Sequence, residues 1–281
     1  MTDWRNPRRF SFVWILSGSL TFFAGGGVAD ELAPVPEIRP GFPEGYLAKE
    51  AVPDSAALLP PPPALGSAAA ALDQEIARAD LALRGTPRWD LARIDAELSF
   101  PEAAGAFSCA LGIAITRQDT PRLYVMLRRV LIDAGAATSA AKDKYKHARP
   151  FMLDDQPICR PEDESFLRAN GSFPSGHASF GWAWALVLAE ISPDHGEAVL
   201  KRGRAFGESR VVCNVHWESD VIEGQLMGTA TVARLRAEPA FLADLEAAKS
   251  ELAAARAKAL EPQRDCKFEA DALAQTPAQS P

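Results

Sequence analysis

Apolar side chains recur at helical spacing over much of this chain, whereas alternating apolar and polar runs, which indicate strands, are few. From Pro121 to Ala140, apolar residues recur one and two turns apart, at Leu123, Met126, Leu127, Val130 and Leu131. One face of a helix there would be apolar, and Pro121 suits its first turn. Helices are also expected over Ala68–Leu83, Asp194–Val212, Ser219–Arg236 and Pro239–Leu260. The pattern therefore predicts an all-α fold.

One further predicted helix, Phe180–Ile191, is apolar on nearly every side. A helix without a polar face is normally surrounded by protein. Crossing a bilayer needs about 20 apolar residues, and this segment is shorter. We therefore expect it to lie buried at the centre of the domain.

The first 29 residues have the pattern of an export signal. Three arginines precede the apolar stretch 10–23, and the small residues Gly27 and Ala29 fit cleavage before Asp30. The alternative is a membrane anchor, for which the apolar stretch falls short of about 20 residues. We expect a cleaved signal at residues 1–29, and a periplasmic or secreted protein without membrane contact after cleavage.

Composition divides the rest of the chain into three parts. Residues 30–65 are rich in Pro and Ala and end in Pro60–Pro63, which cannot be helical and favour an extended arm. Residues 66–260 contain the predicted helices and would form a single helical-bundle domain. Residues 261–281, with Gln, Pro and Ser, are expected to form a loosely ordered tail.

Charge and cysteine content narrow the classes of partner. The formal net charge of -7 among 281 residues leaves no basic surplus for a nucleic-acid partner. In an oxidising compartment the four cysteines could form disulfides, in any of three pairings. No two of them have C-x-x-C spacing, so no zinc site is expected.

The first of three chemically informative segments contains Lys142 and Arg149, followed by Pro150. The two cations are seven positions apart, so on a helix they would point the same way two turns apart. Pro150 disfavours the helical conformation at Arg149 and predicts a helix end there. Alternatively, the two cations only complement the dipole at a helix C-terminus.

The second segment, Ser175-Gly176-His177, directly precedes the predicted buried helix. The alternative is that Ser175 or Ser179 serves only as an N-cap. The same step also offers backbone N–H groups, a hydroxyl and an imidazole to one anion, and Gly176 allows a close backbone approach. Binding of an anion is the functional interpretation.

The third segment contains Arg210, His216 and Asp220. His216 and Asp220 are four positions apart, within reach of each other on a helix. A carboxylate that accepts one ring N–H fixes the tautomer and leaves the other nitrogen free to attack. The alternative is a surface ion pair of little energetic value.

The remaining histidines, His147 and His195, are expected to be peripheral or on the surface.

Together the three segments supply three cations, an anion-binding turn, and two histidines of which one has a carboxylate nearby. Phosphoryl transfer needs neutralised charge around phosphorus, an in-line nucleophile and an acid for the leaving oxygen. The combination therefore favours chemistry on a phosphate group.

These residues resemble the PAP2 superfamily, and within it the bacterial class A non-specific acid phosphatases. The family pattern K-x6-R-P, P-S-G-H and S-R-x5-H-x3-D is matched at every spacing, by Lys142…Arg149-Pro150, Pro174-Ser175-Gly176-His177 and Ser209-Arg210…His216…Asp220. The likeness covers roughly residues 55–250.

The resemblance implies an all-α domain of the PAP2 type and a metal-independent acid phosphatase without a cofactor. His216 would be the nucleophile that becomes phosphohistidine, Asp220 would orient it, and His177 would be the general acid and base. The groups that would bind phosphate are Lys142, Arg149, Ser175, Gly176 and Arg210. Small phosphate monoesters would be the substrates, with phosphotransfer to alcohols as a side activity, and a homo-oligomer is one option for the quaternary structure.

The comparison with the family also suggests a disulfide pairing. Cys109 is unusual for the family and Cys266 lies beyond the resemblance, so we expect a Cys109–Cys266 bridge that holds the tail. Cys159 and Cys213 would form the second bridge.

Three other functions fit parts of the same pattern. A vanadium haloperoxidase shares this anion site and holds vanadate in it, but the short chain and the flanking motifs favour the phosphatase. Lipid phosphatases of the superfamily are usually polytopic, and no 18-residue apolar run follows the signal. A non-catalytic periplasmic phosphate-binding module would not need the nucleophile and its carboxylate.

Overall fold

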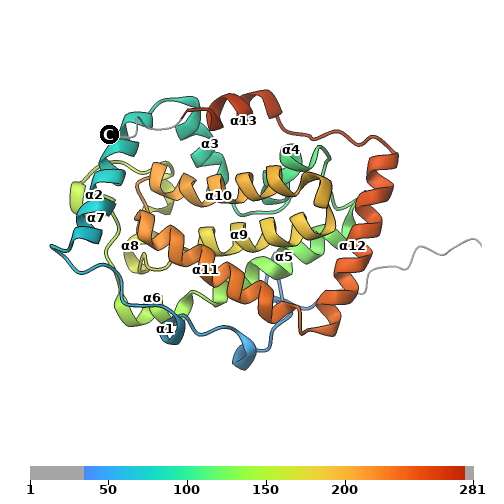
Figure 1. The fold of residues 1–281 in the computed structure, drawn as a ribbon, viewed down its shortest axis with the longest axis horizontal. Coiled ribbons are helices and arrows are strands. Elements are labelled where there is room, and N and C mark those ends of the chain that lie inside the picture. The colour runs from blue at the N-terminus through green and yellow to red at the C-terminus, as the bar shows by residue number, and fades with distance from the viewer. Residues whose placement is uncertain (1–34, 276–281) are drawn as a thin grey trace, which may run out of the picture. The chain divides into compact units, whose positions relative to one another are not determined.

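The apolar segment at the centre of the sequence forms helix α9, Gly176–Ile191, in which ten of 16 residues are buried. In the computed structural model, which describes residues 35–275, α9 packs against α10 (Gly196–Val212), α11 (Glu218–Leu235) and α5 (Pro121–Ala136). Figure 1 shows α9, α10 and α11 side by side, with α12 (Pro239–Ala257) across their ends. The prediction of a buried central helix is confirmed.

Two glycines allow the neighbouring helices to approach α9 closely. A Cβ at Gly203 of α10 would collide with the side chain of Ala185, and one at Gly224 of α11 would collide with the carbonyl oxygen of Ser175. The second contact matters for the site, because it brings the start of α11 against the start of α9.

Aromatic side chains fill the core between α9, α10 and the segment before α4. The fully buried Trp184 has Phe180 and Phe206 at ring-centroid distances of 5.4 and 6.1 Å, and Phe107 at 6.2 Å. Its indole N–H donates to the carbonyl oxygen of Leu127 at 2.8 Å. The only polar atom of the ring is therefore satisfied inside the core.

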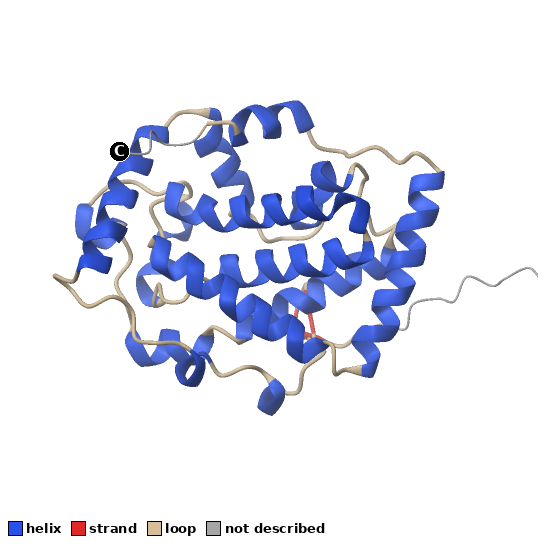
Figure 2. Ribbon diagram, viewed as in Figure 1, coloured by secondary structure: helices blue, strands red, loops and turns tan. Residues whose placement is uncertain are grey.

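Smaller elements surround this centre, and the described residues are mainly helical (Figure 2). The remaining α-helices are α1 (Ser55–Leu58), α2 (Ala68–Asp80), α3 (Pro87–Asp95), α4 (Ser108–Leu111), α6 (Ser139–Tyr145), α7 (Phe151–Asp154), α8 (Glu164–Ala169) and α13 (Cys266–Leu273). Short 3-10 helices cover Lys49–Ala51, Leu81–Leu83, Glu102–Phe107, Pro161–Asp163 and Pro193–His195. Two antiparallel strands, β1 (Glu37–Arg39) and β2 (Phe42–Pro43), form the sheet. The predicted all-α class is confirmed.

The helix predicted over Pro121–Ala140 is interrupted, which the sequence pattern did not indicate. Helix α5 ends at Ala136, and Thr138 turns the chain by donating its hydroxyl to the carbonyl oxygen of Gly135 at 2.8 Å. Helix α6 then begins at Ser139.

The part of the Pro-rich arm that the structure describes is fixed along the domain. The carboxylate of Asp133 accepts the backbone N–H groups of Tyr46 and Leu47 at 2.7 and 3.2 Å. Further along, the Ser55 hydroxyl accepts the N–H of Ala141 at 3.0 Å, and Leu59 is buried. The arm is therefore not extended throughout, since it contains α1.

The predicted signal at residues 1–29 lies outside the described residues. Within 35–275 no helix is long and apolar enough to span a membrane.

The C-terminal segment departs from the sequence expectation. Residues 261–281 were expected to be loosely ordered, but Cys266–Leu273 form α13, which packs against α3. The Asp265 side chain caps this helix, and Cys266 is bonded to Cys109. Within α13, Glu269 lies 3.4 Å from the buried Arg202. A covalent bond and a buried charge therefore fix a segment whose composition suggested disorder.

Both expected disulfides, Cys109–Cys266 and Cys159–Cys213, are present.

Candidate functional site

The first segment does not place its two cations on one helix, contrary to the prediction. Helix α6 ends at Tyr145, and Lys146 adopts the left-handed conformation at φ 45°. Its N–H bonds to the carbonyl oxygen of Lys142, which closes the helix. Arg149 therefore lies in the following loop, yet its side chain is only 2% exposed.

Backbone carbonyl groups hold both cations. The Arg149 guanidinium donates from Nε to Leu167 O at 2.9 Å and from Nη1 to Val215 O at 2.8 Å. The ammonium group of Lys142 donates to Gly171 O at 2.7 Å and to Ser172 O at 3.2 Å. These bonds join the first segment to α8, to the loop before the second segment and to the turn within the third.

The second segment forms the start of α9. Ser175 is the N-cap and accepts the N–H of Ala178 at 3.3 Å, so the capping interpretation of Ser175 is confirmed. Gly176 and His177 are the first two residues of the helix, while Ser179 lies inside it and bonds to Ala134 O. The Ser175 N–H donates to the backbone oxygen of Asp220 at 2.8 Å. The second and third segments are thus in direct contact at a helix N-terminus, where N–H groups favour an anion.

The end of α10 positions His216. The helix stops at Val212, and Asn214 takes the left-handed conformation at φ 60°. The chain then folds back, so that the N–H of His216 donates to the carbonyl oxygen of Arg210 at 3.3 Å. This turn puts the nucleophile candidate and the third cation next to each other.

The His216 ring lies between a carboxylate and a guanidinium. Its Nδ1 is 3.1 Å from Asp220 Oδ2, and its Nε2 is 3.1 Å from Arg149 Nη1. An ionised carboxylate only accepts hydrogen bonds and a guanidinium only donates them. The ring is therefore protonated at Nδ1, and its Nε2 lone pair faces Arg149. Since both residues are buried, the alternative of a surface ion pair is wrong.

The surroundings keep this pair in the neutral-imidazole, ionised-carboxylate state. Burial, and then the charge of Arg149, lowers the pKa of His216 well below its usual value. Burial alone would raise the pKa of Asp220, but the neighbouring rings of His147 and His216 hold it well below its ordinary value. His216 thus has an available lone pair at neutral and mildly acidic pH.

Three cations of the site are buried or half-buried, and burial lowers the pKa of each. Burial, with the charge of Arg149, lowers the pKa of Lys142 to about 7 and that of Arg210 to about 9. Burial lowers the pKa of Arg149 to about 10. Arg210 is 2% exposed, and its Nε and Nη1 atoms have no hydrogen-bond partner among the described residues. Buried donors without partners are rare in proteins, and this arrangement suits an anion with several oxygen atoms.

A cavity of about 710 Å³ reaches His177 and Arg210. Its other lining residues include Ala96, Phe100, Tyr124, Arg128, Arg160 and Phe166. His177 Nε2 lies 3.4 Å from the carbonyl oxygen of Ala96, at the end of α3. Burial, then the charge of Arg210, lowers the pKa of His177. The cavity thus gives a ligand access to an imidazole and to the unpaired guanidinium.

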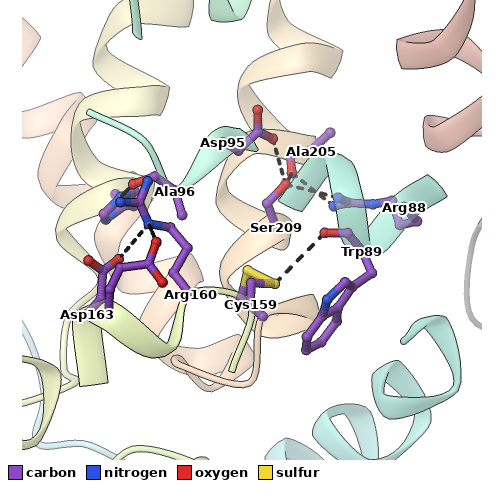
Figure 3. Close-up of a disulfide and its surroundings, with 12 residues drawn as sticks. Arg88, Trp89, Asp95, Ala96, Cys159, Arg160, Asp163, Ala205 and Ser209 are labelled. Atoms are coloured by element: carbon purple, nitrogen blue, oxygen red, sulfur yellow. Dashed lines mark hydrogen bonds and ion pairs between the residues drawn. A yellow bond between two sulfur atoms is a disulfide. The ribbon is translucent and has the colours of Figure 1, made fainter. Parts of the chain in front are cut away.

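A buried polar network supports α10 immediately before Arg210. The hydroxyl of Ser209 donates to Asp95 at 2.7 Å and accepts from Arg88 at 3.0 Å. Figure 3 shows Ser209 between these two residues, close to the disulfide of Cys159. That disulfide bonds to Cys213, three residues after Arg210. Both ends of the turn that carries Arg210 are therefore fixed.

One contact near the site was not indicated by the sequence. His147 is partly exposed and does not line the large cavity, in line with the expected peripheral position, but its Nδ1 lies 3.6 Å from Asp220 Oδ1 and 3.1 Å from the Ser172 hydroxyl. Only its position inside the first motif could have pointed to it. His195, by contrast, lies at the start of α10 near Ser192 and Arg256. Within residues 35–275 no three His, Cys, Asp or Glu side chains are grouped so as to hold a metal ion.

Comparison with known proteins places this arrangement in a family. A model of the PAP2 superfamily matches residues 123–238, which contain all three segments. A non-specific acid phosphatase of Providencia stuartii is 43% identical over 209 residues, 74% of this chain and 84% of the relative. A non-specific acid phosphatase of Salmonella typhimurium is 43% identical over 181 residues, covering 64% and 72% of the two chains. An acid phosphatase of Zymomonas mobilis is 39% identical over 197 residues, covering 70% and 75%. The chain therefore belongs to the PAP2 superfamily and, within it, to the family of the non-specific acid phosphatases.

Proposed function

We propose that this protein is an acid phosphatase that hydrolyses small phosphate monoesters through a phosphohistidine at His216, without a metal ion. The observation that carries the proposal is the His216 ring held by Asp220, with its Nε2 lone pair beside the cationic cluster. The family relationship supports the reaction class, and the local geometry supports the roles of individual residues.

In this proposal the phosphate group binds among Lys142, Arg149 and Arg210. The unpaired Nε and Nη1 of Arg210 donate to two phosphoryl oxygens, as planar guanidinium groups do well. Ser175 and the N–H of Gly176 complete the binding site at the start of α9, where the helix dipole favours negative charge. Each lowered cation pKa would rise again next to a dianion, so substrate binding favours the charged forms.

The first chemical step forms a bond from His216 Nε2 to phosphorus and breaks the bond from phosphorus to the ester oxygen. The leaving oxygen takes a proton from His177, and the alcohol departs. The phosphorylated ring keeps its Nδ1–H on Asp220, which stabilises the positive charge that develops there. Because the Ala96 carbonyl can only accept, His177 Nε2 carries a hydrogen in every state. The proton given to the leaving oxygen is therefore a second one, on Nδ1 of the imidazolium form, which the negative charge of the bound phosphate favours.

The second step reverses the proton transfer. His177 takes a proton from a water molecule, whose oxygen attacks phosphorus and breaks the bond from phosphorus to His216 Nε2. Inorganic phosphate is released and both rings return to their starting states. An alcohol in place of water would give phosphotransfer by the same route.

The proposal includes the location of the protein and its independence of metal. All four cysteines are in disulfides, which persist in oxidising compartments, and this supports export to the periplasm or the medium. Three cations around one phosphoryl group supply the charge neutralisation that Mg²⁺ supplies in kinases. We therefore expect full activity in excess EDTA.

Two measurements test the proposal. Purified protein should hydrolyse p-nitrophenyl phosphate at pH 5 to 6 with EDTA present, and quenching with labelled substrate should trap a base-stable, acid-labile phosphoenzyme. His216→Ala should abolish both signals while phosphate still binds. An active enzyme whose phosphoenzyme survives in His216→Ala would contradict the assigned nucleophile, and activity that EDTA abolishes and metal restores would contradict the metal-free mechanism.

A further inference from the structure

The carboxylate of Asp220 has partners on both of its oxygen atoms, and the mechanism above uses only one of them. Oδ2 accepts from His216 Nδ1 at 3.1 Å and from the N–H of Trp217 at 2.9 Å. Oδ1 faces the Ser172 hydroxyl at 3.4 Å and His147 Nδ1 at 3.6 Å. Asp220 is fully buried, so the groups on Oδ1 contribute to fixing the orientation in which Oδ2 meets His216.

The Ser172 hydroxyl links His147 to the carboxylate. Its oxygen lies 3.1 Å from His147 Nδ1. It also lies 3.4 Å from both Asp220 Oδ1 and the carbonyl oxygen of Ala148. The ionised carboxylate is the stronger acceptor of the two, so Ser172 donates its hydrogen to Asp220 and accepts one from His147. The resulting series of hydrogen bonds runs from His147 through Ser172 and Asp220 to His216.

The surrounding structure holds His147 in this position. Its carbonyl oxygen accepts the N–H of Ser172 at 2.9 Å. Its ring contacts Phe173 and Trp217, each at a centroid distance of 6.4 Å. The left-handed turn at Lys146 directs the chain to this point. The ring is therefore fixed by backbone and side-chain contacts together.

His147 reaches solvent on a different side from the substrate. Its side chain is 25% exposed and lines a small cavity with Asp73, Gln74 and Trp217. This cavity shares no lining residue with the large cavity that contains His177 and Arg210. His147 therefore opens onto a different cavity from His177 and Arg210, and its contacts with the site run through Ser172 and Asp220.

We propose that His147 is a positioning residue for the nucleophile, which acts through Ser172 to fix the Asp220 carboxylate against His216. This inference rests on the proposed function, because it assigns His216 as the attacking group. It predicts that His147 affects the chemical step and leaves the binding of phosphate unchanged.

The test compares two variants of His147. His147→Phe keeps a ring but removes the donor, and kcat should fall about tenfold, within the range of couplings in one hydrogen-bond network. KM and the inhibition constant for inorganic phosphate should stay unchanged. His147→Asn places an amide N–H close to where Nδ1 lies, and should restore most of the lost kcat. His195→Phe is the matched control and should behave like the wild type.

Ser172→Ala provides a second, independent variant. Because the link passes through Ser172, His147→Phe should cause little further loss of kcat in the Ser172→Ala background. Thermal unfolding of each variant separates a loss of fold from a loss of positioning. Independent, additive losses in the double variant would overturn the proposed link.

A spectroscopic measurement separates this inference from the phosphatase proposal. In the folded protein with ¹⁵N-labelled histidine, His147→Phe should shift the Nδ1 resonance of His216, and His195→Phe should not. A wild type without phosphatase activity would refute the proposed function alone. An unchanged His216 resonance, or an unchanged kcat in His147→Phe with active wild type, would refute the positioning role.

Discussion

The role of Arg210 can be tested through protein stability. This side chain should destabilise the ligand-free protein, although phosphate binding requires it. It is 2% exposed, with two guanidinium nitrogens unpaired among the described residues. Burial, with the charge of Arg149, lowers its pKa to about 9, so the folded protein disfavours the charged form of this side chain. Even buried ion pairs can often be replaced by apolar residues of similar volume with a neutral effect or a gain of about 1 to 4 kcal/mol, and Arg210 has the burial without hydrogen-bond partners for these two nitrogens within residues 35–275.

Arg210→Met should therefore raise the melting temperature of the ligand-free protein. At about 2 to 4 °C per kcal/mol for a domain of this size, we expect a rise of roughly 5 °C. The same variant should lose affinity for phosphate. Two hydrogen bonds to a charged group are worth about 3 to 6 kcal/mol together, which is a Kd increase of about a hundredfold to ten-thousandfold.

Arg202 is the matched control, because it lies on the same helix and is equally buried. Its guanidinium is bonded to Asp95 and lies 3.4 Å from Glu269. Arg202→Met would leave Asp95 buried without its partner, which typically destabilises by about 3 to 5 kcal/mol. We expect its melting temperature to fall by roughly 10 °C on the same scale.

The assay is thermal unfolding with and without inorganic phosphate at pH 6. Wild-type protein at a phosphate concentration of about 100 times Kd should gain about 2.7 kcal/mol, and Arg210→Met should show almost none of this gain at the same concentration. If Arg210→Met lowers the melting temperature as Arg202→Met does, or keeps the phosphate response, then Arg210 is a structural residue and the anion site is wrongly assigned.

Three further predictions address pH, acid catalysis and the disulfide. The pKa of Lys142 is about 7 in the free protein, so the residue is cationic below pH 7 and loses its charge above it. Inhibition by phosphate should weaken as pH rises through this range. In Lys142→Arg the inhibition should persist to higher pH, because arginine keeps its charge. If the inhibition has the same pH dependence in this variant as in the wild type, Lys142 does not cause that dependence. His177→Asn should slow hydrolysis of alkyl phosphates by about a hundredfold or more and p-nitrophenyl phosphate far less, and equal losses on both would remove His177 from the acid role. Replacing Cys109 and Cys266 by Ser opens a loop of 157 residues and should cost about 2 to 4 kcal/mol of stability while kcat is retained; a large loss of kcat without unfolding would show that α13 acts on the site.

The sequence by itself determined the helical class, the central helix and the family. Helical spacing of apolar residues located α5 and α9 because burial on one side or on all sides selects side chains by face. The three motifs were recognisable because each one has fixed local spacing. His216 and Asp220 meet through such spacing, across the start of α11.

Only the tertiary structure decided how the three motifs meet and what surrounds them. Arg149 reaches His216 from a loop that is 67 positions away in the chain, and no local pattern encodes that distance. The same reason explains two features that the sequence did not indicate. His147 contacts Asp220 across 73 positions, and Cys266 and Glu269 bind the tail to distant partners although its composition suggested disorder. Local spacing follows from backbone geometry, whereas contacts between distant segments depend on the packing of the whole core.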